Sequence, residues 1–282
     1  MKVLVTGAKG QLGTDTVKEL SLRGIAHKGV DHSDFDITDK NAVFDAIQEY
    51  RPTAVIHCAA YTAVDKAEDE PELCRQINED GTRNIALVCN EIDAKMISIS
   101  TDYVFPGHGS HFHLTTDPTG PISVYGKTKL AGERSVLETL NRAFIVRISW
   151  AFGHHGNNFV NTMLRLGKER DQVSVVCDQI GSPTNTADLA SLLCEMAASE
   201  RYGIYHATNE GICSWAEFAK EIFHQAGIST KVNPIPTREY PTKASRPLNS
   251  RLDKSCLDNA GFMRLPHWKV ALQKHLKSLK EF

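Results

Sequence analysis

The chain has 282 residues, of which 41% are hydrophobic and 23% are charged, as in an ordinary globular protein with a sizeable core. A formal net charge of −2 gives no reason to expect nucleic acid or an anionic membrane as a partner. The sequence shows no long apolar run and no basic-then-apolar leader, and its seven cysteines are scattered without C-x-x-C spacing. We therefore expect a cytoplasmic protein with reduced thiols and no cysteine metal site.

The chain opens with a short apolar strand, Lys2 to Val5, that runs into three glycines spaced three residues apart. Gly7 permits a tight turn, Gly10 lets a phosphate approach the backbone, and Gly13 lets the helix expected over 11–23 pack against the sheet. The N-terminus of such a helix presents free N–H groups to an anion. The spacing is G-x-x-G-x-x-G instead of G-x-G-x-x-G, so the motif predicts a dinucleotide site or, alternatively, a turn alone.

Strand and helix patterns alternate through the first 150 residues. We expect strands at 26–30, 54–58, 96–100 and 143–148, and helices at 41–50, 77–92 and 123–140. This rhythm predicts an α/β fold with a doubly wound parallel sheet that has helices on both faces. Right-handed crossovers then place the ligand at the carboxyl ends of the strands.

The pattern is less regular after Trp150. We expect helices at 159–168, 187–198, 215–226 and 268–280, strands at 173–176 and 203–206, and a proline-punctuated loop at 234–247. Residues 1–150 are therefore predicted to form a dinucleotide-binding domain. Residues 151–282 are predicted to form mainly a smaller substrate-binding lobe, with segments that return to the core of the first domain.

A Tyr-x-x-x-Lys pair, Tyr125 and Lys129, lies on the helix expected over 123–140. Residues at i and i+4 share one helix face, so the phenol and the ammonium can reach the same ligand. A neighbouring ammonium favours the phenolate and lowers the pKa of the tyrosine, which makes it a usable acid or base near neutral pH. The alternative is a solvated surface pair that arises by chance.

Hydroxyl groups follow the strand expected at 96–100, where ligands bind in such sheets. Thr101 can donate a hydrogen bond to a carbonyl or alkoxide oxygen beside Tyr125. Its alternative role is to cap a helix.

The glycine turn, Ser100–Asp102 and Tyr125–Lys129 together resemble the extended short-chain dehydrogenases/reductases, which have a Rossmann-like sheet. Further stretches make the chain similar, along essentially its whole length, to the dTDP-4-dehydrorhamnose reductase family: Ala59–Glu68, Ser100–Phe105, Val124–Glu133, Arg147–Trp150, Asn157–Phe159 and Arg246–Leu252. The resemblance implies reduction of the C4 keto group of dTDP-4-dehydro-L-rhamnose to dTDP-L-rhamnose, the last step of dTDP-rhamnose synthesis, with NAD(P)H as hydride donor.

The resemblance also implies roles for individual residues. Tyr125 would donate the proton to the C4 oxygen, Lys129 would bind the nicotinamide ribose and lower the tyrosine pKa, and Thr101 would bind the substrate oxygen. The turn and the resemblance together predict these cofactor-binding residues: Gly7, Gly10, Gln11, Leu12, Gly13, Asp31, Asp36, Ile37, Ala60, Tyr61, Thr62, Ile99, Tyr125 and Lys129. The predicted substrate-binding residues are Val64, Thr101, Asp102, Tyr103, Trp150, Asn158, Arg246, Asn249 and Ser250.

Two of these assignments have plain structural alternatives. Trp150 can be a core aromatic, and Arg246 can be a solvated loop charge. In its substrate role, Arg246 would grip a diphosphate, because its rigid fork donates two bonds at once.

The cofactor specificity depends on the acid after the second strand. Asp31 lies about twenty residues past the turn, where a carboxylate binds a ribose 2′-OH and disfavours a 2′-phosphate. Lys28 and His32 lie close in sequence and can offset that effect. We expect NADP(H), with NAD(H) also accepted.

Some members of the resembled family hold magnesium between two subunits with glutamates. Here the first such position is Asp15, and the second falls near Ala187, beside Asp188. Because magnesium prefers an octahedral set of oxygen ligands, this incomplete carboxylate set predicts no interface metal and a monomer or weak homodimer.

Two other functions fit the same sequence features. The first is a reductase of another nucleotide-linked keto sugar, such as a UDP-linked amino sugar, which would share the site chemistry. The second is a non-catalytic regulatory subunit that binds a dinucleotide. Intact Thr101, Tyr125 and Lys129 argue against the second.

Overall fold

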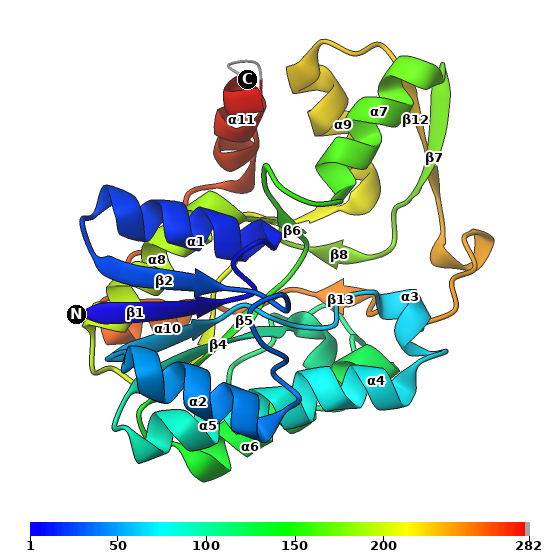
Figure 1. The fold of residues 1–282 in the computed structure, drawn as a ribbon. Coiled ribbons are helices and arrows are strands. Elements are labelled where there is room, and N and C mark those ends of the chain that lie inside the picture. The colour runs from blue at the N-terminus through cyan, green and yellow to red at the C-terminus, as the bar shows by residue number, and fades with distance from the viewer. Residues whose placement is uncertain (280–282) are drawn as a thin grey trace.

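The computed structural model describes residues 1–279, and a parallel β-sheet lies at its centre (Figure 1). The sheet has six strands in the order β10-β5-β4-β3-β1-β2. Each neighbouring pair is parallel, which confirms the predicted doubly wound, Rossmann-like α/β fold. The strands are β1 (Lys2–Thr6), β2 (Ala26–Val30), β3 (Ala54–His57), β4 (Lys95–Thr101), β5 (Ala143–Ile148) and β10 (Gly203–His206).

Helices cover both faces of the sheet, and each face has its own apolar core (Figure 1). Strands buried on both faces have near-continuous apolar sequences, which explains the aliphatic runs in β3 and β5. One face packs against α1 (Gln11–Leu22), α8 (Thr186–Ala198) and α10 (Ser255–Ala260). The other packs against α2 (Lys40–Tyr50), α5 (Thr82–Glu91) and α6 (Val124–Thr139).

The second half of the chain builds a smaller lobe beside the carboxyl ends of the strands (Figure 1). Its apolar core includes Phe152, Phe218, Phe223 and Trp268. Its helices are α7 (Phe159–Glu169), α9 (Trp215–Ala226) and α11 (Trp268–Leu279). Its strands are β6 (Ala151–Phe152), β7 (Gln172–Val176), β8 (Ile180–Gly181), β9 (Thr184–Asn185), β11 (Cys213–Ser214), β12 (Lys231–Ile235) and β13 (Asn249–Ser250).

The helix predicted over 77–92 has a different course in the structure. Helical backbone starts earlier, at α4 (Pro71–Arg75), and passes through a π-helical turn, Gln76–Gly81, before α5 begins. Within the turn, the Asn78 amide donates to the carbonyl of Tyr61 at 3.1 Å and to Thr128 Oγ1 at 3.2 Å. Apolar periodicity carries no information about such long-range polar contacts, so it predicted one uninterrupted helix.

The predicted loop at 234–247 begins with a strand instead. β12 runs through Pro234 to Ile235 and pairs with β7 in parallel. This two-stranded sheet has only edge strands, where a proline without an N–H is tolerated. The helix predicted over 268–280 begins as expected at Trp268, whereas Lys280 lies outside the described residues.

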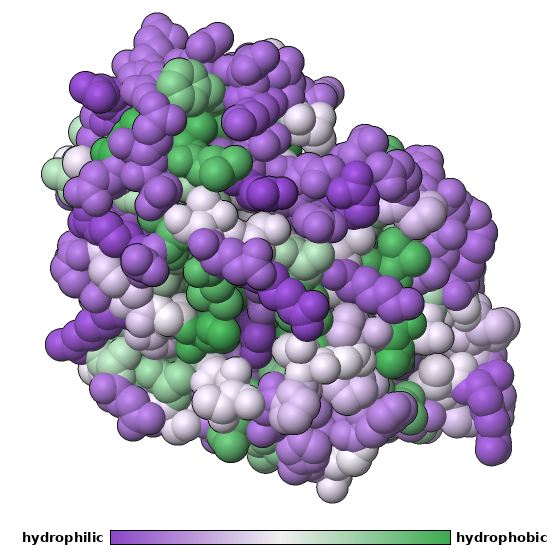
Figure 2. All heavy atoms as spheres, turned by 90° about the horizontal axis from the view of Figure 1, so that it is seen from below, coloured by the Kyte–Doolittle hydropathy of each residue, from purple (hydrophilic) through white to green (hydrophobic). Residues whose placement is uncertain are grey.

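Short elements connect these layers: helix α3 (Val64–Ala67) and the 3-10 turns Asp102–Val104 and Thr237–Glu239. The face that carries α2, α5 and α6 is largely hydrophilic, with hydrophobic atoms in separate small groups (Figure 2). Within residues 1–279, no helix is both long enough and apolar enough to cross a bilayer. All seven cysteines are free thiols.

Candidate active site

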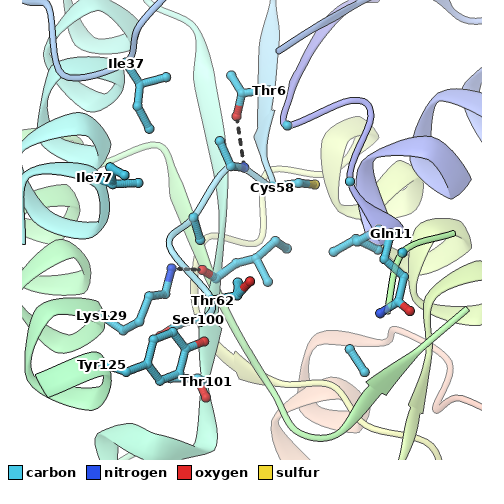
Figure 3. Close-up of a pocket in the computed structure, with 18 of the residues that line it drawn as sticks. Thr6, Gln11, Ile37, Cys58, Thr62, Ile77, Ser100, Thr101, Tyr125 and Lys129 are labelled. Atoms are coloured by element: carbon cyan, nitrogen blue, oxygen red, sulfur yellow. Dashed lines mark hydrogen bonds between the residues drawn. The ribbon is translucent and has the colours of Figure 1, made fainter. Parts of the chain in front are cut away.

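A pocket of about 1010 Å³ lies at the carboxyl ends of the strands, where the doubly wound topology predicts a ligand. It extends from the glycine turn, past the end of β4, to the first turn of α6 (Figure 3). Seventeen of the predicted site residues line it: Gly7, Gly10, Gln11, Leu12, Asp31, Asp36, Ile37, Ala60, Thr62, Val64, Ile99, Thr101, Asp102, Tyr103, Tyr125, Lys129 and Trp150.

The glycine turn has the geometry that its spacing predicted. Gly7 has a φ of +66°, a region that favours glycine, and a Cβ there would lie 2.7 Å from the Ala59 nitrogen. A Cβ on Gly13 would lie 2.0 Å from the Gly7 carbonyl oxygen, so Gly13 acts in packing and does not line the pocket. Gly10 caps α1 without a side-chain hydrogen bond, which leaves the first N–H groups of the helix available to a phosphate.

Asp31 lies at the far end of the pocket, directly after β2. Its carboxylate accepts hydrogen bonds from the backbone N–H of Lys9 at 2.9 Å and of His32 at 2.8 Å. The Lys9 ammonium also joins the loop after β1 to the loop after β2, because it donates to Ser33 Oγ at 2.9 Å. Lys9 and His32 both line the pocket and bring positive or protonatable groups close to Asp31.

Tyr125 and Lys129 extend from the first two turns of α6 into the pocket (Figure 3). The Ser123 hydroxyl caps the helix by accepting from the Gly126 N–H at 3.1 Å. A Cβ on Gly126 would lie 2.4 Å from the carbonyl oxygen of Tyr103, so glycine lets the helix start against this segment. The rings of Tyr103 and Tyr125 then meet edge to face, with centroids 5.4 Å apart.

The protonation of Tyr125 differs from the sequence-based expectation. Burial raises the pKa of the phenol above its ordinary value, and the hydroxyl of Thr101 opposes this only in part. The Lys129 ammonium donates to the carbonyl of Ile99 at 2.7 Å (Figure 3). The net pKa of Tyr125 is therefore raised in this structure, and the phenol holds its proton at neutral pH, while the lowering effect expected of Lys129 stays a prediction.

Burial also governs the charge of Lys129. It lowers the pKa of the ammonium to about 8, and the carboxylate of Glu133, one turn further along α6, acts in the opposite direction. The same ammonium contributes to a low pKa of His57, which burial lowers to about 3. Lys129 is consequently charged at neutral pH, and His57 is neutral.

Thr101 has the capping role weighed for it, and it also lines the pocket. Its oxygen accepts from the Tyr103 N–H at 3.2 Å and so caps the 3-10 turn, while the side chain lines the pocket. Its hydroxyl donates to Asp102 Oδ1 at 3.0 Å, and Ser250 donates to the other oxygen of the same carboxylate. Burial nevertheless raises the pKa of Asp102 to about 6.

A buried ion pair lies behind this wall of the pocket. The Arg147 guanidinium donates to both carboxylate oxygens of Glu133, at 2.9 and 2.7 Å, and Ser100 also donates to Glu133. The side chains of Arg147 and Glu133 are each 3% exposed. Because these residues belong to β5, α6 and β4, the pair joins the helix that carries Tyr125 to the strands beneath it.

Specific contacts hold Trp150 and Arg246, an aromatic and a basic residue predicted to bind substrate. Trp150 has a φ of +52° and stacks on Trp215 with centroids 3.8 Å apart, so it both packs and lines the pocket. Arg246 pairs with Asp65 at 2.6 Å and donates to the Tyr103 hydroxyl at 3.1 Å. Arg246 is therefore ion-paired in this structure, and its role toward a diphosphate stays a prediction.

The remaining predicted residues lie outside the pocket lining. Tyr61 donates through its hydroxyl to Glu70 at 2.7 Å, and the Asn158 amide donates to Gln11 Oε1 at 2.8 Å, one residue removed from the pocket. Asn249 is fully buried and donates to the carbonyl of His111 at 2.8 Å, so it holds a loop. The members of this group are Gly13, Tyr61, Asn158, Arg246, Asn249 and Ser250.

Sequence patterns missed part of the lining. Leu73, Gln76 and Ile77 enter the pocket from α4 and the π-helical turn, which the periodicity did not resolve. The π-helical turn is stabilised by contacts with residues far along the chain, so no local sequence signal marked these positions. The other lining residues outside the predicted set are Thr6, Lys9, Val30, His32, Phe35, Thr38, Cys58, Ala59, Ser100, Ile148, Ser149, Ala151, Gly156 and Asn157.

Comparison with known proteins identifies the family of this site. The model of the RmlD substrate binding domain family matches residues 1–281. The chain belongs to this family. It is 44% identical to a dTDP-4-dehydrorhamnose reductase of Streptomyces griseus, over 98% of this chain and 93% of that protein.

Two solved structures share the whole fold. A dTDP-4-dehydrorhamnose reductase from Bacillus anthracis in complex with NADP is 44% identical and superposes with a TM-score of 0.96, covering 99% of this chain and all of that one. A reductase of the same name from Clostridium acetobutylicum is 42% identical, with a TM-score of 0.97 and the same coverage. A single RmlD-type fold therefore spans both the sheet and the smaller lobe.

Replacing Glu133 by glutamine tests the buried ion pair. Glu133→Gln leaves the Arg147 charge buried without its partner, so we expect the free energy of unfolding to fall by about 3–5 kcal/mol. Glu169→Gln is the matched control, because Glu169 pairs with Arg165 on an exposed face. We expect this control substitution to lower the free energy of unfolding by less than about 1 kcal/mol. Urea unfolding followed by circular dichroism measures both, and equal losses would contradict the prediction.

Proposed function

We propose that the chain catalyses the NADPH-dependent reduction of the C4 keto group of dTDP-4-dehydro-L-rhamnose to dTDP-L-rhamnose. The observation that carries the proposal is the meeting of Thr101, Tyr125 and Lys129 in the pocket that starts at the glycine turn. The named relatives support it, since curated reductases of this substrate match nearly the full chain. Synthesis of a nucleotide sugar fits a cytoplasmic location.

The residues of the pocket fit a dinucleotide. Gly7 and Gly10 line the pocket beside the uncapped N-terminus of α1, which can bind a pyrophosphate. Asp36 and Ile37 line the end proposed for adenine. When bound, the reduced nicotinamide supplies the hydride. Lys9 and His32 lie near Asp31 and can accommodate a 2′-phosphate, so we assign NADP(H), as in the Bacillus anthracis complex, with NAD(H) accepted as well.

Three side chains divide the proton chemistry. As C4 receives the hydride, the carbonyl electron pair takes a proton from the Tyr125 hydroxyl, which burial keeps protonated beforehand. Lys129 supplies the positive charge that favours the resulting phenolate and binds the ribose hydroxyls. In the bound state, the Thr101 hydroxyl turns its single hydrogen from Asp102 to the same substrate oxygen.

The substrate occupies the side of the pocket that faces the smaller lobe. Val64, Asp102, Tyr103 and Trp150 border the sugar. Arg246 lies next to Tyr103 and offers its fork to the diphosphate, with Asn158 and Ser250 behind the lining. In this assignment, residues 1–150 bind the dinucleotide and residues 151–282 contribute mainly substrate contacts.

The decisive experiment measures NADPH oxidation with dTDP-4-dehydro-L-rhamnose and with its UDP analogue. We expect turnover of the dTDP substrate and a loss of kcat/KM of about 10²–10⁴-fold in Tyr125→Phe, because the proton donor is gone. Tyr240→Phe, at an exposed tyrosine outside the pocket, is the control.

A preference for the UDP compound would favour the other keto-sugar reductase. Binding of NADPH without turnover of either compound would reject catalysis and leave the regulatory role. Full activity in Tyr125→Phe would reject Tyr125 as the proton donor.

The pH dependence tests the charge on Lys129. Because the ammonium has a pKa of about 8 and its charged form is the active one, kcat/KM should fall about tenfold per pH unit above that value. Lys129→Met should be slow at every pH and should lack this limb. A wild-type profile that stays flat to pH 10, or the same limb in Lys129→Met, would contradict the role.

We also propose a monomer or weak homodimer without a magnesium ion between subunits. Both carboxylates considered for that ion are engaged within the chain: Asp15 accepts from Thr186, and Asp188 accepts from the Asn209 amide at 2.9 Å. Gel filtration should give the same elution volume with magnesium and with a chelator. A dimer that forms only with magnesium would refute this proposal.

A further inference from the structure

We propose that His111, His113 and Asp117 form a binding site for a divalent transition metal of the zinc class. The three side chains lie in the loop between the 3-10 turn Asp102–Val104 and α6. One ligand atom of each lies within 4.8 Å of the other two. The cluster lies outside the lining of the active-site pocket, and the proposal does not depend on the reductase activity.

The distances are close to those of a bound ion. His111 Nε2 lies 3.7 Å and His113 Nδ1 lies 3.9 Å from the same carboxylate oxygen, Asp117 Oδ2. Nitrogen and oxygen ligands bind zinc at about 2.0–2.2 Å, so neighbouring ligand atoms of a tetrahedral site are about 3.4 Å apart. A contraction of a few tenths of an ångström brings both histidine-to-carboxylate distances to that spacing, and the third pair of atoms lies within 4.8 Å. The exposed His111 can supply the movement by rotation.

Two of the three ligands are already fixed. The His113 ring is buried and stacks on Phe105 with centroids 4.4 Å apart and planes within 4°. Its backbone N–H donates to the carbonyl of Arg251 at 2.9 Å, which ties the loop to the chain beyond β13. Asp117 Oδ2 accepts from the Leu114 N–H at 2.9 Å. A site with this much order in place loses little entropy on binding.

The second nitrogen of the His113 ring, Nε2, contacts the side chain of Asn249. The Asn249 amide nitrogen lies 3.4 Å from Nε2 and donates to the carbonyl of His111 at 2.8 Å. Asn249 thus contacts both histidines of the cluster. Because this amide nitrogen is a donor and a metal on Nδ1 requires the ring hydrogen on Nε2, binding of an ion moves the Asn249 amide off Nε2.

The ligand set selects the class of metal. Two imidazoles and one carboxylate suit zinc, cobalt, nickel or copper, whereas magnesium and calcium prefer oxygen ligands throughout. Imidazole binds a metal in its neutral form, through the ring nitrogen that carries no hydrogen. With three protein ligands, a fourth position stays open beside the exposed His111.

A bound ion would cross-link the loop that carries His111, His113 and Asp117. Through Phe105, this loop contacts the buried ion pair of Arg147 and Glu133 that lies behind the candidate active site. Phe105 lies between the His113 ring and the Arg147 guanidinium, which is 5.1 Å from the Phe105 centroid. Arg147 in turn holds Glu133 of α6. The expected consequence is a protein that is more resistant to unfolding with the metal than without it.

Tag-free, metal-stripped protein titrated with Co²⁺ and Zn²⁺ tests the site. We expect one Co²⁺ per chain, with visible absorption bands of a tetrahedral complex that Zn²⁺ abolishes and Mg²⁺ does not. The melting temperature should rise with the Zn²⁺ concentration. X-ray absorption at the zinc edge should report two imidazoles.

Variants on the protein surface assign the ligands. His111→Ala and Asp117→Asn should each weaken Zn²⁺ binding by more than about tenfold, since losing even a contact behind a metal ligand costs about 10–100-fold. His108→Ala is the matched control, because His108 is exposed in the same loop but is not part of the cluster. No stoichiometric binding, or equal binding by wild type, His111→Ala and Asp117→Asn, would overturn the proposal.

Discussion

The buried pair of Glu133 and Arg147 is the interaction on which the candidate site depends. It joins α6 to β5, and Ser100 adds β4 to the same carboxylate. A paired charge in a dry interior is costly to disturb, so the helix has one position relative to the sheet. That position brings Tyr125 and Lys129 to the carboxyl end of β4, where Thr101 follows the strand.

Burial at this junction sets the protonation states that the proposed chemistry needs. The phenol of Tyr125 is held neutral and can give a proton. Lys129 has a pKa of about 8, so it loses its charge as the pH rises above that value. Glu133 has two roles in this arrangement, because its carboxylate fixes Arg147 and also supports the charge on Lys129. The Glu133 carboxylate therefore affects both the packing of α6 on the sheet and the charge of Lys129 in the pocket.

The lobe formed by the second half of the chain completes the pocket from the other side. Trp150 leaves β5 with a left-handed backbone and stacks on Trp215, which connects the sheet to α9. Arg246 returns from far along the sequence to Tyr103 and Asp65. The polar and aromatic groups proposed for the substrate therefore meet at the boundary between the two halves, as expected for a site that binds two ligands side by side.

The sequence by itself determined the parallel sheet, the glycine turn and the pair at Tyr125 and Lys129, because strand periodicity, backbone freedom and helical spacing are local properties. Only the tertiary structure decided the π-helical turn at Gln76–Gly81, the pKa of Tyr125 and the contact of Asn249 with His113. Each of these depends on burial or on contacts between segments far apart in the chain. Local patterns carry no record of such contacts, so they could not predict them.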